Sequence, residues 1–155
     1  MKYVARSDYP QWLRLALGNN VFSLGATQAA VAAKFSLVQL LNPPGSLVTV
    51  VILGVTDGVT AVAGEVRWNN TAGATLIGTG KATRGGVANS SAQVYTDAQT
   101  ALAGTVVQNI LAGDSLQLST LQSGLYVLDP GVGIQIDLTI VNTALTTNFL
   151  WAELS

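Results

Sequence analysis

The chain contains neither cysteine nor histidine. Without cysteine it has no disulfide, no thiolate metal ligand and no cysteine nucleophile. Without histidine it lacks the commonest general base and the commonest metal ligand, so serine-histidine and cysteine-histidine catalysis cannot be built. We therefore expect a protein that is not an enzyme and that has no metal site and no cofactor.

Charge is also scarce. Charged residues make up 10% of the chain and hydrophobic residues 49%, whereas typical soluble domains carry about 25% charged residues. Seven basic and eight acidic residues leave a net charge of −1, which gives no field to attract nucleic acid or anionic lipid. We expect a surface that is either covered by partner subunits or coated with neutral polar side chains.

No hydrophobic run is long enough for a transmembrane helix. The longest, at 47–55, is rich in β-branched residues and has about half the required length, which indicates a buried strand. The first ten residues contain no apolar core of a secretory signal. We expect no membrane association and synthesis in the cytoplasm.

What the sequence does contain is a regular succession of turns. A chain of 155 residues fits one domain that removes about 70% of its unfolded surface from water. Turn-forming pairs recur along it: Asn42-Pro43-Pro44-Gly45, Asp57-Gly58, Asn69-Asn70, Gly85-Gly86, Gly113-Asp114 and Asp129-Pro130-Gly131. The segments between them are short, which is typical of strands.

Alternation of apolar and polar residues supports this interpretation. In 132–141, apolar Ile134, Ile136 and Leu138 alternate with Gln135 and Asp137, which predicts a strand with one buried face. In the final strand both faces are mostly apolar, with Phe149 and Trp151 on one of them. We expect that strand to be covered on both sides, and Phe149 and Trp151 to lie in the core or at a subunit interface.

Further strands are predicted near 20–24, 30–42, 46–55, 63–69, 75–83, 103–110, 115–120 and 123–128, an exposed polar loop at 84–101, and a short helix at 10–17. Many strands divided by turns predict an all-β fold. The expected architecture is a single antiparallel β-sandwich, jelly-roll-like, at 21–155.

Residues 1–20 differ from the rest and predict an N-terminal arm. They hold three of the seven basic residues together with aromatic ones, and the side chains predicted to contact another protein are Lys2, Tyr3, Arg6, Tyr9, Trp12 and Arg14. The alternative is a segment that packs on its own domain.

Paired carboxylates are the remaining route to catalysis, since two of them can hydrolyse a glycoside. The available carboxylates are Asp8, Asp57, Glu65, Asp97, Asp114, Asp129, Asp137 and Glu153. Several lie beside glycine or proline, so we interpret the set as turn formers and solvated strand positions.

Tryptophan offers a different kind of site. Trp12, Trp68 and Trp151 could stack on sugar rings, although one tryptophan per strand is more typical of packing. Trp68, or the loop at 84–101, is the predicted ligand site if the protein binds a carbohydrate or a receptor.

Two segments carry a resemblance to a known group of proteins. Residues 126–136, followed by Asn142-Thr143 and by 149–153, resemble the closing strands of small jelly-roll structural proteins of tailed bacteriophages. Residues 38–46, with the valine-rich strand after them, are similar to the central hairpin of those proteins. Together these segments cover less than half of the chain.

The resemblance implies a structural protein of the virion. Such proteins decorate or cement capsids or form head fibres, often as trimers, and no catalytic residue carries over. The function expected from it is a capsid decoration or cement protein, a homotrimer attached to the major capsid protein or to another virion protein. The alternative is a receptor- or carbohydrate-binding β-sandwich module of a phage fibre or tail.

Overall fold

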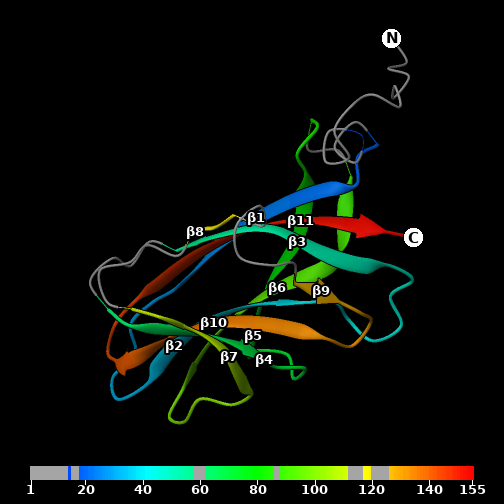
Figure 1. Cartoon of the computed structure of the whole chain (residues 1–155). Coiled ribbons are helices and arrows are strands. Elements are labelled where there is room, and N and C mark those ends of the chain that lie inside the picture. Colours follow the sequence, from blue (N-terminus) through cyan, green and yellow to red (C-terminus); the bar gives the residue numbers. More distant parts are fainter. Residues whose placement is uncertain (1–13, 15–17, 58–61, 86–87, 112–116, 120–125) are drawn as a thin grey trace.

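The computed structural model describes residues 14, 18–57, 62–85, 88–111, 117–119 and 126–155 (Figure 1). The secondary-structure elements of these residues are all strands, which confirms the predicted all-β fold. Their bounds are β1 Val21–Gln28, β2 Phe35–Leu41, β3 Thr49–Asp57, β4 Gly64–Trp68, β5 Thr75–Ala82, β6 Asn89–Gln99, β7 Thr105–Ile110, β8 Gln117–Ser119, β9 Val127–Leu128, β10 Gly133–Val141 and β11 Leu145–Leu154.

The strands form one curled antiparallel sheet. Its order is β7-β4-β10-β2-β6-β5-β1-β11-β3-β8, and β9 pairs with β3 beside β8. In Figure 1 the strands β1, β3 and β11 lie in the upper part of the molecule and β2, β4, β7 and β10 in the lower part. The curl brings the two parts face to face, so that β11 also contacts β2 and β10.

The pairing is nested from the ends of the chain inward. The first strand pairs with the last, β1 with β11, and the second with the next to last, β2 with β10. Inside these, β3 pairs with β8 and β9, and β4 pairs with β7. The hairpin of β5 and β6 joins the two halves, because β5 pairs with β1 and β6 with β2.

One hydrophobic core fills the space inside the curl. Alternate residues of each half supply it, including Val38 and Leu40 of β2 and Ile134 and Ile136 of β10, together with Trp151 of β11. The period-2 alternation noted in the sequence is the cause, since every second side chain of a strand points to the same face.

Two turn segments predicted from the sequence, 42–45 and 129–131, lie against each other. Asn42 joins them: its side-chain amide donates to the carbonyls of Val48 and Leu128, both at 2.9 Å. Its backbone N–H donates to Val132, and its carbonyl accepts from Gly131. These contacts close one end of the sheet next to β9.

The largest error of the sequence interpretation is the loop predicted at 84–101. Most of it is β6, which with 11 residues is the longest strand of the sheet. Its inward positions are filled by small or modest side chains, Ser90, Ala92, Val94 and Thr96, all buried. They are buried although they are not large, because β6 lies between β2 and β5 near the middle of the sheet.

Most other predicted strands are confirmed, with altered bounds. The segment predicted at 30–42 is a strand only from Phe35, because residues 31–34 form a turn in which Ala33 has φ 57°. The helix predicted at 10–17 lies outside the described residues except for Arg14. The same holds for the arm at 1–20, of which residues 14 and 18–20 are described.

Candidate functional site

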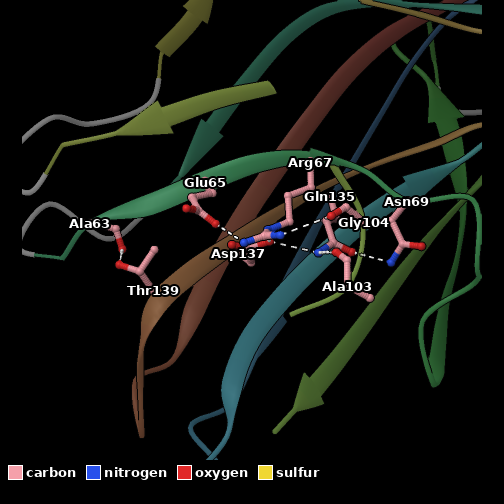
Figure 2. Close-up of polar contacts among 9 residues, drawn as sticks. All are labelled: Ala63, Glu65, Arg67, Asn69, Ala103, Gly104, Gln135, Asp137 and Thr139. Carbon is pink, nitrogen blue, oxygen red and sulfur yellow. Dashed lines mark hydrogen bonds and ion pairs between the residues drawn. The ribbon is translucent and has the colours of Figure 1, made fainter. Parts of the chain in front are cut away.

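The most elaborate polar arrangement in the described part of the chain lies on the outer face of β2, β4 and β10 (Figure 2). Gln135 of β10 lies opposite Gln39 of β2 and Arg67 of β4, and Asp137 lies opposite Glu65. Their side chains share one face because directly paired residues of neighbouring strands point the same way. This face is opposite to the hydrophobic core.

Two loops cover this face and bury the amides. Gln135 donates to the carbonyl of Ala103 at 3.1 Å and accepts from the side chain of Asn69 at 2.7 Å. Gln39 donates to the carbonyls of Asn69 and Thr71, at 2.6 and 3.0 Å. The loops at 69–74 and 100–104 are thus held down by glutamine side chains that are 0% exposed.

A charged cluster continues the amide row. Arg67 forms an ion pair with Glu65 through its Nη2 and another with Asp137, with Nε 3.1 Å from Oδ2. The N–H of Nε has no acceptor in line, so this second contact is an ion pair without a hydrogen bond. Gln135 donates to the same Oδ2 at 2.9 Å, while Asp137 Oδ1 has no partner.

Burial dominates the electrostatics of Asp137. Loss of hydration raises the pKa of its carboxyl to about 6, although the hydrogen bond from Gln135 and the positive charge of Arg67 lower it; the nearby charge of Glu65 raises it further. A carboxyl of this kind exchanges its proton close to neutral pH. The cluster holds two carboxylates and one guanidinium, so ionised Asp137 leaves it with an excess negative charge.

The amides of this arrangement hold the two loops against the sheet. Asp137 is 0% exposed, so a glycoside could reach its oxygens only after the covering loops had moved. Within the described ranges, no group of three or more acidic, cysteine or histidine side chains could hold a metal ion.

The carboxylates therefore correct one interpretation made from the sequence. Asp137 is not a solvated strand position, and the outer face of β10 is buried along with its inner face from Ile134 to Leu138. Glu153 is also buried, and its two oxygens accept from the backbone N–H groups of Ser91 and Ala92 at 3.0 and 2.9 Å. Both carboxylates are structural ties between segments distant in sequence.

The residues predicted to contact a shell fall almost wholly outside the described part of the chain. Lys2, Tyr3, Arg6, Tyr9 and Trp12 are not described. Arg14 is exposed, and its carbonyl accepts a hydrogen bond from the N–H of Gly18 at 3.0 Å. The role predicted for this group stays a prediction.

Phe149 and Trp151, for which core and subunit interface were both open, belong to the core of this chain. Phe149 is 1% and Trp151 0% exposed, and the Trp151 ring packs on Phe22 with ring centres 6.3 Å apart. Both side chains are buried within this chain, and the interface role predicted for them stays a prediction.

Trp68, the predicted ligand residue, is half-buried at the margin of the core. Tyr126 meets its ring edge to face, with centroids 5.7 Å apart. The Tyr126 hydroxyl donates to Gln108 at 2.9 Å, and burial raises the pKa of its phenol. The Trp68 ring is thus engaged in packing within the chain, and the ligand role predicted for it stays a prediction.

Comparison with known proteins gives no relative from which a role could be transferred. The chain matches no family model, no curated protein and no solved structure. In the described segments there is no helix with the length and apolar character needed to cross a membrane.

Proposed function

We propose that the chain is a structural protein of a virus particle, a capsid decoration or cement protein of the jelly-roll type that associates with itself, as a trimer, and attaches to a shell. The observation that carries the proposal is the nested pairing of β1 with β11, β2 with β10, β3 with β8 and β9, and β4 with β7. Pairs nested in this way are what a long hairpin gives when it is rolled up.

Two runs of four strands follow from that roll. One is β1-β11-β3-β8 and the other is β2-β10-β4-β7, with the β5–β6 hairpin inserted between them. Double-sheet jelly rolls of eight strands are common in viral capsid proteins, lectins and cupins. The resemblance of residues 38–46 and 126–153 to phage structural proteins favours the first of these classes.

The surface also supports assembly. Among the residues that the structure describes, ten large hydrophobic side chains are exposed, including Leu47, Leu76 and Leu111 at 92%, 51% and 69%. A monomer with only 10% charged residues gains stability when such groups are covered by other subunits.

The first test locates the protein on particles. An antibody raised against the purified chain is applied to particles from the cells that express it, and the particles are examined by electron microscopy. We expect label at regular positions on the outside of the shells. Label confined to the soluble fraction would contradict attachment.

The second test concerns the arm and the mass. Light scattering should give three times the monomer mass of 16.0 kDa. Removal of residues 1–18 should abolish attachment and leave the trimer folded. A truncated protein that still decorates particles would show that the arm is not the contact.

A receptor- or carbohydrate-binding module is the second function that we consider. It would use Trp68, which is half-buried beside Tyr126. A glycan array that detects binding, lost in Trp68→Ala without a fall in melting temperature, would favour this alternative over decoration.

A further inference from the structure

Four neighbouring strands of the upper half stop at the same end of the sheet. They lie in the order β5-β1-β11-β3, with Val21 and Thr49 as the first residues of β1 and β3, and Ala82 and Leu154 as the last of β5 and β11. Thr49 lies opposite Leu154, and the N–H of Thr83 donates to the carbonyl of Val21. Figure 1 shows the tip of β11 and the start of β1 together at this end. The segments before β1 and β3 and after β5 therefore leave the sheet side by side, over three strand spacings or about 14 Å.

Three of the five basic residues that the structure describes lie at this end. Arg14 precedes β1, Arg84 follows β5, and Lys81 lies opposite Ser23 of β1; all three basic residues are exposed. Lys81 donates to the side chain of Asn89. That amide is neutral, so the contact leaves the charge of Lys81 unbalanced.

Negative charge is scarcer among the described residues of this end. The side-chain carboxylates here are Glu153 and Asp129. Glu153 is buried, and its two oxygens accept from the N–H groups of Ser91 and Ala92. Asp129 is exposed but follows β9, which lies beyond β3 and thus on the far side from Lys81. The described surface near β1 and β5 is therefore basic.

Exposed apolar side chains lie beside these cations. Leu154, the last residue of β11, is 37% exposed, and Leu47, two residues before β3, is 92% exposed. Val127 of β9 lies opposite Val51 of β3 and is 41% exposed. Covering such groups removes apolar surface from water and so favours association. We call the following residues the arm end: Arg14, Leu47, Lys81, Arg84, Val127 and Leu154.

We propose that the arm end binds an acidic and partly apolar surface of the shell protein. The proposal rests on the attachment in the proposed function and names the surface that makes it and the chemistry of the partner. Opposite charges across an interface speed the encounter and select the partner, and the apolar side chains then leave water. Lys2 and Arg6 precede Arg14 in the sequence, so the arm and this end together hold five of the seven basic residues.

A protein surface fits this end better than nucleic acid or an anionic membrane does. The whole chain has a net charge of −1, so an extended polyanion gains nothing from the molecule beyond its basic end. A phosphate backbone also offers no apolar group to cover Leu47 and Leu154. An acidic patch of limited size on a protein meets the basic end alone.

A trimer would present the arm end three times. A three-fold axis relates its copies by rotation alone, so the three ends lie at one level and can contact the shell together. Three linked contacts hold a particle more tightly than one.

The test changes the basic and the apolar part separately. Lys81→Glu and Leu47→Glu are mixed with shells that have been purified from the expressing cells and washed free of the protein, and the bound fraction is measured by sedimentation. Lys34→Glu and Ile140→Glu are the controls, because both positions lie toward the opposite end of the sheet, where Phe35 pairs with Val141. Melting temperatures of all four variants report whether they are folded.

We expect the two arm-end variants to bind the shells at least about tenfold more weakly, since each places a like charge against the acidic partner. Binding of the wild type should weaken as NaCl rises from about 0.05 to about 0.5 M, because salt screens exposed charges. The controls should bind as the wild type does.

The outcomes separate this proposal from the one on which it rests. If the wild type and both arm-end variants sediment equally with the shells, this end is not the contact, although attachment stands. A wild type that never sediments with them overturns both. Binding that does not respond to salt overturns the acidic partner.

The same proteins are also mixed with duplex DNA and with vesicles of phosphatidylserine and phosphatidylcholine. We expect no binding of the wild type to either. Binding that Lys81→Glu abolishes would assign the arm end to nucleic acid or to lipid and overturn the proposal.

A second measurement identifies the surface that is contacted. Because the chain has no cysteine, Leu47→Cys can carry a single photoreactive group, and Ile140→Cys serves as the control. After illumination on the shells, mass spectrometry should find Leu47→Cys linked to a shell peptide that contains Asp or Glu. A linked peptide without acidic residues, or equal linking of the two variants, would contradict the proposal.

Discussion

Gly80 lies directly against the indole of Trp151. A Cβ atom built on Gly80 would lie 2.3 Å from Cη2 and 2.4 Å from Cζ2 of that ring. Trp151 is 0% exposed and is one of the largest side chains in the core. The most voluminous group of the core is therefore accommodated by the absence of a side chain on β5.

Gly80→Ala should lower the free energy of unfolding by about 3 kcal/mol, the upper range for overpacking of a core. Urea denaturation measures it. Gly25→Ala is the matched control, because its Cβ would meet the flexible end of the exposed Asn148 side chain. In the double variant Gly80→Ala/Trp151→Phe, the smaller phenyl ring leaves room for the added methyl group. The double variant should therefore lose less stability than the sum of the losses of the two single variants. If the losses of unfolding free energy of the two single variants simply add, the side chains at positions 80 and 151 do not clash.

The pH dependence of stability should report Asp137. The pKa of Asp137 in the folded protein is about 6, against 3.8 for an unperturbed aspartate side chain. Because the folded state holds the proton more tightly, this group's contribution is fully present below pH 3.8 and is lost as the pH rises through 6. The loss amounts to about 3 kcal/mol.

Urea denaturation of the wild type and of Asp137→Asn between pH 4 and 8 tests this expectation. The variant should lack that part of the decline, whereas Asp129→Asn, at an exposed position, should follow the wild type. Parallel curves for wild type and Asp137→Asn would mean that Asp137 does not titrate in this range.

Asn42→Ala should cost about 3 kcal/mol of unfolding free energy, because three hydrogen bonds of a buried side chain are lost, each worth about 1 kcal/mol. Two go from Asn42 to Val48 and Leu128, and one comes from Ser46. Asn148→Ala is the comparison, since that exposed amide makes one contact at 3.5 Å. Thermal unfolding of the two variants should differ clearly. Similar melting temperatures would argue against a role of Asn42 in closing this end.

Ala33→Gly should stabilise the protein by about 1 kcal/mol. Ala33 follows Ala32 in a turn closed by the N–H of Lys34 and the carbonyl of Val31, and its φ of 57° is costly for a residue with a Cβ. Ala32→Gly is the control, because Ala32 has no such φ and glycine there only adds freedom to the unfolded chain. Differential scanning calorimetry measures the effect. A lower melting temperature for Ala33→Gly than for the wild type would contradict the expectation.

The sequence predicts most of the strands because turn residues and period-2 alternation are local signals. The signal fails for β6, where Ser90, Ala92 and Thr96 are buried without being large. Their burial is caused by their place between β2 and β5, which no window of sequence contains.

The polar site was not predictable for a related reason. Alternation in β10 correctly places Gln135 and Asp137 on the face away from the core, and solvent is the ordinary expectation for that face. Two loops cover it, residues 69–74 and residues 100–104, and both are distant from β10 in the sequence. Glu153 is similar, since it binds N–H groups of Ser91 and Ala92, about sixty residues earlier.

The nested pairing has a consequence for how the chain is made. Val21 lies opposite Ala152, so β1 finds its long partner only after β11 has left the ribosome. A nascent chain that stops before Leu145 has no β11 to pair with β1 or β3. The closing contact therefore forms late in folding, because it joins strands far apart in the sequence, whereas β4 with β7 and β5 with β6 can pair earlier.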